Sequence, residues 1–258
     1  MRHLCGWGTG VLTCLVLAAA ARAADPEAIN RAVQLGVGYI KTLPLDDGPD
    51  PSPQTGATAL VGLTLLECGV PATDPVVRGA ADAVRKASVH LTHTYSLALS
   101  VLFLDRLGEE ADVPIIESLT VRLLAGQTVN GGWNYNCPDV PESEARRLNT
   151  LLKQRNELST RPRGEVAQTG DPQRAAAQRK VTDEIRQQIE VINRAAGRRP
   201  SGRDDNSNTQ FAVLALWVAR RHGLPTDDAL AHVNTRFRGS QHGDGGWSYM
   251  YTGHSPGA

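Results

Sequence analysis

Two adjacent carboxylates, Asp204 and Asp205, lie in the stretch GRDDNSNTQFA and could act as a general acid. A carboxyl group can donate a proton near neutral pH when burial and neighbouring charge keep it protonated. The same stretch is also typical of a helix N-terminus, because short polar side chains accept hydrogen bonds from free backbone N–H groups. We favour the capping interpretation and retain Asp204 and Asp205 as candidate catalytic residues.

Three further residues could contact a ligand: His93 in THTYSLALS, and His242 with Asp244 in GSQHGDGGWSYM. A catalytic zinc site needs three protein ligands and an open position. The sequence offers no Asp-x-Cys pair that would complete such a set with His93. A histidine that packs at a helix start is the simpler interpretation of His93, and turn residues that of His242 and Asp244. The sequence therefore predicts no metal site and no cofactor.

The stretch around His242 contains a motif that occurs twice, 114 residues apart, in GQTVNGGWNY and GSQHGDGGWSYM. We call it the Gln–Trp motif. Its matching positions are Gln127, Gly131 and Trp133 in the first copy and Gln241, Gly245 and Trp247 in the second. Paired glycines permit a tight turn, the glutamine amide can satisfy helix-end backbone groups, and the indole can pack between helices. The motif is therefore expected to be structural and to join successive repeats.

Three apolar segments are long enough to be buried helices rather than strands. They run from Thr55 to Gly69, from Thr94 to Gly108 and from Thr209 to Gly223. Each glycine is placed to end its helix in the left-handed conformation. A more polar helix follows each segment, and another precedes the first, so the chain alternates outer and inner helices as repeat proteins do.

The Gln–Trp motif at the end of an outer helix resembles the QW repeat of squalene–hopene cyclases, oxidosqualene cyclases and related prenyltransferases. The resemblance covers about residues 27–140 and 204–258. It implies an all-α fold, an α/α toroid of inner helices ringed by outer ones, here a partial or open barrel of three inner and four outer helices. Cyclases of this family protonate an alkene with a D-x-D-D-T-A stretch, and Asp204 and Asp205 stand at a comparable place without the first aspartate. The zinc-binding prenyltransferases hold their metal with Asp, Cys and His. Only the histidine has a counterpart here, His93.

Residues 139–203 interrupt the repeat with 14 Lys/Arg and 9 Asp/Glu side chains. Two apolar stripes at helical spacing predict an inserted helical hairpin. They comprise Leu148, Leu151, Leu152 and Leu158, and then Val181, Ile185, Ile189 and Ile192. The hairpin is expected to be a solvated decoration, with a basic docking arm as the alternative. The domain plan is a signal peptide (1–23), the first part of the toroid (24–138), the charged insertion (139–203) and the continuation of the toroid (204–258).

The first 23 residues have the three parts of a secretory signal peptide: Arg2, the apolar run 11–21, and a cleavage site near Ala23. Export implies a secreted or periplasmic protein, with no transmembrane segment in the mature chain. Cleavage leaves 25 basic and 27 acidic side chains, a balance that argues against nucleic acid as a partner. Of the remaining cysteines, Cys68 and Cys137 could pair, but a buried free thiol at Cys68 is favoured.

These features together predict an exported scaffold or binding protein whose partner is an unknown apolar ligand or another protein. The alternative is an isoprenoid enzyme, either a terpene cyclase or a prenyltransferase-like protein, with its catalytic residues outside this chain or in an atypical arrangement. Fold resemblance alone does not establish activity.

Overall fold

The computed structural model describes residues 25–45, 53–158, 185–192, 194 and 204–251. Over these ranges the regular structure is helical, with only isolated backbone bridges besides, which confirms the all-α class. The expected signal peptide lies outside the described residues. The chain divides between Leu43 and Pro44 into two units. In the first unit, helix α2 (Pro26–Ile40) is capped by Asp25, whose carboxylate accepts a hydrogen bond from the backbone N–H of Glu27 at 3.1 Å.

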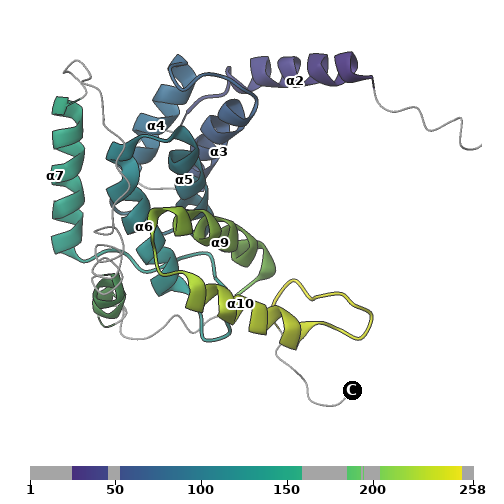
Figure 1. The fold of residues 1–258 in the computed structure, drawn as a ribbon, viewed down its shortest axis with the longest axis vertical. Coiled ribbons are helices and arrows are strands. Elements are labelled where there is room, and N and C mark those ends of the chain that lie inside the picture. The colour runs from purple at the N-terminus through teal and green to yellow at the C-terminus, as the bar shows by residue number, and fades with distance from the viewer. Residues whose placement is uncertain (1–24, 46–52, 159–184, 193, 195–203, 252–258) are drawn as a thin grey trace, which may run out of the picture. The chain divides into compact units, whose positions relative to one another are not determined.

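The second unit contains three apolar helices that lie side by side: α3 (Pro53–Glu67), α5 (Thr94–Leu107) and α9 (Asn206–Ala219). In Figure 1, α5 lies between α3 and α9, and α5 packs against both. The three helices run parallel. Gly56 and Gly62 of α3 face residues 96 and 103 of α5 in the same order, and the starts of α5 and α9 meet where the Tyr95 hydroxyl donates to Ser207 Oγ at 2.6 Å. These are the predicted inner helices.

Three outer helices connect and cover the inner ones: α4 (Pro75–Ala87), α6 (Val113–Gly126) and α10 (Asp227–Ser240). Helix α4 packs on α3, α6 on α5 and α9, and α10 on α9. Short 3-10 turns lie before α6 (Glu110–Asp112) and after α9 (Arg220–His222). The three predicted stop glycines all have positive φ, 80° at Gly69, 73° at Gly108 and 76° at Gly223. Glycine adopts this left-handed conformation without the Cβ clash that other residues meet.

The aligned threonines do not hold one shared position at the start of the inner helices. Thr55 is the third residue of α3, Thr94 the first of α5 and Thr209 the fourth of α9. The reason is that α9 begins three residues earlier relative to its threonine, because Asp205 caps it. The helices therefore do not all begin at the threonines that open the apolar segments of the sequence.

The insertion packs on the helical layers by both of its described legs. Helix α7 (Glu142–Leu158) buries Ala145 and Leu148 against Val89 and Val140. The helical residues 185–192 bury Ile185 and Ile192 in a cluster with α6 and the end of α9. Helix α6 is consequently buried along most of its length, although a polar outer helix was expected there. Leu158 and Val181, which belong to the predicted stripes, lie outside the residues whose side chains are described.

Within the described ranges, no helix combines the length and apolar character that crossing a membrane requires.

Candidate functional site

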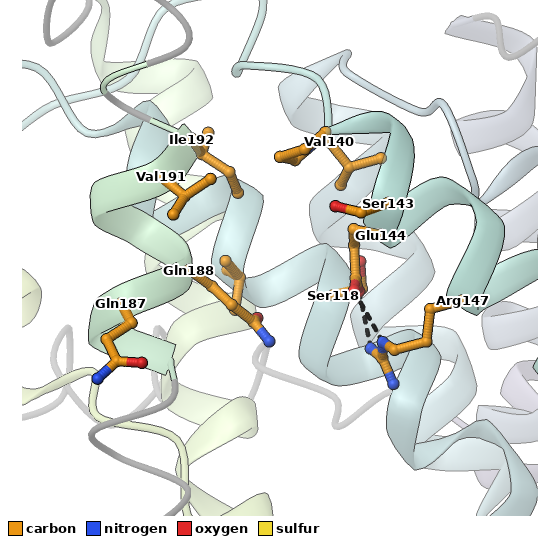
Figure 2. A pocket seen from close by; sticks show the side chains of 11 residues that line it. Ser118, Val140, Ser143, Glu144, Arg147, Gln187, Gln188, Val191 and Ile192 are labelled. Atoms are coloured by element: carbon orange, nitrogen blue, oxygen red, sulfur yellow. Dashed lines mark hydrogen bonds and ion pairs between the residues drawn. The ribbon is translucent and has the colours of Figure 1, made fainter.

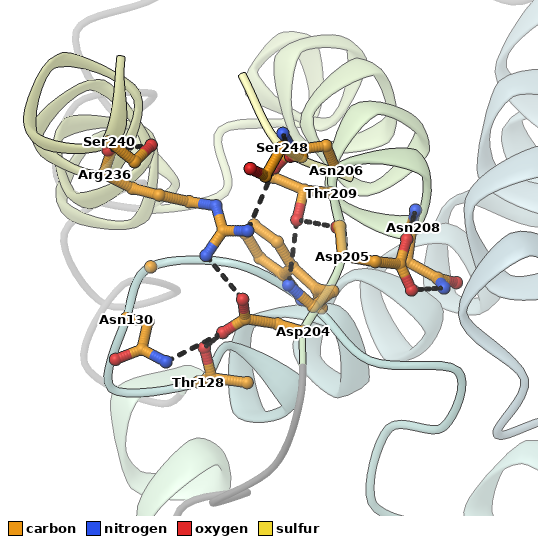
Figure 3. Close-up of polar contacts among 12 residues, drawn as sticks. Thr128, Asn130, Asp204, Asp205, Asn206, Asn208, Thr209, Arg236, Ser240 and Ser248 are labelled. Carbon is orange, nitrogen blue, oxygen red and sulfur yellow. Dashed lines mark hydrogen bonds and ion pairs between the residues drawn. The ribbon is translucent and has the colours of Figure 1, made fainter. Parts of the chain in front are cut away.

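Asp204 lies two residues before α9, next to the capping residue Asp205, and is buried. One carboxylate oxygen accepts a hydrogen bond from Arg236 Nη1 at 2.5 Å. The other oxygen accepts from the Thr128 hydroxyl at 2.5 Å and from the Asn130 amide at 3.2 Å. Figure 3 shows Asp204 between Arg236 and the turn that carries Thr128 and Asn130. This aspartate therefore links the first Gln–Trp motif to α9 and α10.

Arg236 is fully buried together with Asp204, and its second terminal nitrogen donates to the Asn206 side chain at 3.0 Å. Its guanidinium also lies over the Tyr251 ring, 4.5 Å from the centroid. A guanidinium stays charged under all ordinary conditions, and here it forms a buried ion pair with Asp204. Both oxygens of the Asp204 carboxylate are occupied by contacts within the fold.

Asp205 caps α9. Its side chain accepts from the Asn208 backbone N–H and from the Asn208 amide, each at 2.7 Å. Its own backbone N–H donates to the carbonyl of Trp133 at 3.1 Å. Both carboxylates of the candidate acid pair are thus occupied by contacts that fix the start of α9.

The two Gln–Trp motifs share the hydrogen bonds that close their turns. Gln127 donates its amide to the carbonyl of Gly131 at 3.1 Å, and Gln241 does the same to Gly245 at 2.9 Å. The indole of each tryptophan donates to a carbonyl in the last turn of the preceding outer helix. Trp133 donates to Leu123 at 2.7 Å and Trp247 to Phe237 at 2.8 Å. Gly131 and Gly245 both have positive φ, 80° and 86°. The motif closes a turn at the end of an outer helix.

A buried arginine belongs to the same repeated unit, and the sequence analysis missed it. Arg122 and Arg236 are also 114 residues apart, each five residues before the glutamine. Arg122 donates to the carbonyls of Ser88, at 2.7 Å, and of Leu91, at 2.7 Å, just before α5. Arg236 binds Asp204 just before α9. The common spacing was the signal available in the sequence. In α6 and α10, this arginine binds groups in the segment that precedes α5 or α9.

The tyrosine two residues after each motif tryptophan lies near the starts of the inner helices. Tyr135 and Tyr249 bring their hydroxyls to 3.4 Å of each other. The ring centroid of His93, the residue before α5, is 5.8 Å from that of Tyr95 and 6.3 Å from that of Tyr135. Burial lowers the pKa of His93 below its ordinary value, so the neutral ring is favoured. The duplicated motif thus builds an aromatic rim of these four residues.

His242 and Asp244, the remaining candidate residues, form hydrogen bonds within the second Gln–Trp turn. His242 shares a hydrogen bond with Ser248 Oγ at 2.8 Å, and Asp244 accepts from the backbone N–H of Gly246 at 2.9 Å. Both side chains are exposed. Among the residues described, no group of three His, Cys, Asp or Glu side chains is arranged to hold a metal ion.

A cavity of about 460 Å³ lies between α6 and the two legs of the insertion. Figure 2 shows α7 and residues 185–192 facing each other across it. One wall carries the ion pair of Arg147 and Glu144, with two nitrogen–oxygen contacts of 2.7 Å. The hydroxyl of Ser118 is buried and has no hydrogen-bond partner among the described residues. The lining residues are Ser118, Val121, Val140, Pro141, Ser143, Glu144, Arg147, Gln187, Gln188, Val191 and Ile192.

No protein-family model, curated protein sequence or solved structure matches this chain.

Proposed function

We propose that this chain is an exported ligand-binding scaffold built on part of an α/α toroid of the squalene-cyclase and prenyltransferase type. Three features support the toroid: the parallel row of α3, α5 and α9, the outer helices that return the chain between them, and the duplicated Gln–Trp motif. The signal-peptide pattern of residues 1–23 supports export.

The observation that carries the scaffold proposal is the pairing of Asp204 with Arg236. Asp204 stands at the place comparable to the catalytic acid of the cyclases. Here it is buried and bound by three side chains of the fold, Arg236, Thr128 and Asn130, so the position stabilises the junction between repeats. Asp205 is likewise occupied by capping α9.

The cavity beside α6 is the binding site that fits this proposal best. Drug-sized ligands bind in cavities of about 300–1,000 Å³ that are mostly apolar with a few polar groups. Valine and isoleucine side chains form much of the wall, the Glu144–Arg147 pair is neutral as a unit, and Ser118 offers an unpartnered hydroxyl. An uncharged, mainly apolar molecule with one hydroxyl or carbonyl group satisfies all three conditions.

Thermal unfolding of the chain from Ala24 onward, measured with farnesol, squalene and farnesyl diphosphate, tests this assignment. A ligand at 100 times its Kd stabilises the folded state by about 2.7 kcal/mol. We expect farnesol to raise the melting temperature, squalene to raise it less, and the charged diphosphate to have little effect. Ser118→Ala should weaken farnesol binding, and Ser100→Ala is the matched control, because Ser100 is also buried with an unpartnered hydroxyl but does not line the cavity.

Three results would contradict the proposal or its ligand. Conversion of squalene or farnesyl diphosphate into a new product would establish the isoprenoid enzyme instead. A farnesol effect that Ser118→Ala and Ser100→Ala reduce equally would place the ligand elsewhere than in this cavity. A melting temperature that none of the three molecules shifts would leave a protein as the partner of the scaffold.

A further inference from the structure

The helical leg of the insertion, residues 185–192, lines two different cavities with its two faces. Four of its residues line the cavity beside α6 described above: Gln187, Gln188, Val191 and Ile192. Three others line a second cavity, of about 470 Å³: Arg186, Ile189 and Glu190. Residues three and four apart lie on the same side of a helix, so the two sets occupy opposite faces of the leg. The leg therefore separates a cavity that it lines without charge from one that it lines with a cation and an anion.

The second cavity lies where this leg meets the end of α6 and the start of α10. Helix α10 contributes Asp228 and His232, which are four residues apart, as Arg186 and Glu190 are on the leg. Apolar side chains form another part of the lining: Leu124, Ile189, Pro225 and Ala229. The cavity thus combines an apolar surface with charged groups from two elements.

The charged groups of this cavity are available to a bound molecule. Arg186, Glu190 and Asp228 are exposed, and none of them forms an ion pair or a side-chain hydrogen bond with another described residue. Asp227, next to Asp228, differs in this respect because it pairs with Arg220 at 3.3 Å. The cavity therefore offers one guanidinium to a negative group and two carboxylates to a positive group.

We propose that the second cavity binds a free α-amino acid with an apolar side chain. The ammonium and carboxylate groups of such a zwitterion are attached to the same carbon. Side chains four residues apart on a helix are also close, with Cβ atoms about 5–6 Å apart, so Arg186 and Glu190 match this pair of opposite charges. The Arg186 guanidinium binds the carboxylate through two parallel hydrogen bonds, and Glu190 and Asp228 accept hydrogen bonds from the ammonium.

The size and the remaining lining of the cavity agree with this ligand. Small-molecule sites have volumes of about 300–1,000 Å³ and a mostly apolar surface with a few polar groups. The apolar side chains of α6, α10 and the leg receive the side chain of the amino acid. This site is separate from the uncharged cavity of the proposed function and does not depend on it.

Isothermal titration calorimetry of the chain from Ala24 onward with L-leucine tests the proposal. We expect saturable binding at one site per chain. Leucinamide lacks the carboxylate and isocaproate lacks the ammonium, so each should bind about 10-fold more weakly or worse, as the loss of one charged hydrogen-bonding group predicts.

Two pairs of variants locate the site. Arg186→Gln and Asp228→Asn should each weaken leucine binding by about 10-fold or more. Arg194→Gln and Asp227→Asn are the matched controls, because both residues are exposed and neighbour the site without lining it. The unliganded melting temperature of each variant shows whether it is folded.

Three results would overturn the proposal. The first is the absence of saturable leucine binding up to about 10 mM, well above the millimolar range of weak ligands. The second is leucinamide or isocaproate binding as tightly as leucine, since the site would then not recognise a zwitterion. The third is leucine binding that Arg186→Gln and Asp228→Asn leave unchanged, which would place the amino acid elsewhere.

Discussion

Arg122 and Arg236 occupy equivalent positions in the two repeats but bind different groups. Arg122 donates to backbone carbonyls, and burial lowers its pKa to about 10 although the charges of Asp139 and Glu144 act in the opposite direction. Arg236 has Asp204 as a direct partner at 2.5 Å. At the residue scale, an arginine five residues before each motif glutamine therefore holds the segment that leads into the preceding inner helix, while the group that it holds differs.

The two motif tryptophans should differ in their contribution to stability because they differ in burial. Trp133→Ala is expected to reduce the free energy of unfolding by about 3–5 kcal/mol, the usual cost of emptying a buried aromatic site. Trp247→Ala should cost about 1 kcal/mol, since nearly half of the side chain already contacts water. Urea unfolding followed by circular dichroism measures both values. Equal losses would contradict the different surroundings of the two motifs.

The cysteines should differ sharply in reactivity. Both are free thiols. The free thiol preferred for Cys68 is confirmed, but Cys68 is only partly buried, and Cys137 is the buried one. Burial raises the pKa of Cys137 to about 12, and the thiolate is the reactive form. In the native chain from Ala24 onward, iodoacetamide should label Cys68 and leave Cys137 unlabelled until the chain unfolds.

The same shift predicts an alkaline loss of stability. The unfolded thiol ionises near its ordinary pKa of 9.0, whereas the folded one retains its proton up to about 12. The stabilisation is therefore complete below pH 9 and declines as the pH rises from 9 towards 12. Cys137→Ala should lack this component in urea unfolding at pH 8 and pH 10. Rapid labelling of Cys137 by iodoacetamide in the native chain would contradict its burial.

Glycines set the spacing of the inner helices at the scale of elements. A Cβ on Gly62 would lie within 3 Å of the Phe103 ring, so only glycine allows α3 and α5 to approach so closely. Gly62→Ala should destabilise the fold by about 1–3 kcal/mol through overpacking. Gly239→Ala in α10 is the matched control, because nothing lies within 4 Å of its Cβ position. There the gain in helix propensity should add up to about 1 kcal/mol. Thermal unfolding of both variants checks the pair, and a neutral Gly62→Ala would contradict the close packing.

Much of this element pattern could be predicted from the sequence. The inner helices follow from long apolar segments, and their ends follow from Gly69, Gly108 and Gly223, since the left-handed stop is a local property of glycine. The burial of α6 could not be predicted, because it depends on the insertion folding back over it. The Asp204 network could not be predicted either, since Thr128, Asn130 and Arg236 meet it only in three dimensions.

At the scale of the whole unit 44–258, Asp204 is the point where the first motif, α9 and α10 meet. A catalytic acid and a structural carboxylate at this point make opposite predictions for stability. Active-site residues are commonly held at a cost, so replacing them is often neutral or stabilising. Removal of one partner from a buried ion pair leaves the other charge unpaired and typically costs 3–5 kcal/mol.

The free energy of unfolding of Asp204→Asn, compared with that of wild type, is therefore the measurement that tests the account most directly. Asp227→Asn is the control, because its pair with Arg220 is largely exposed and such pairs contribute less than about 1 kcal/mol. The account predicts a loss of about 3 kcal/mol or more for Asp204→Asn and almost none for Asp227→Asn. An Asp204→Asn variant as stable as wild type, or more stable, would contradict the structural role of this carboxylate and return Asp204 to the position of a candidate acid.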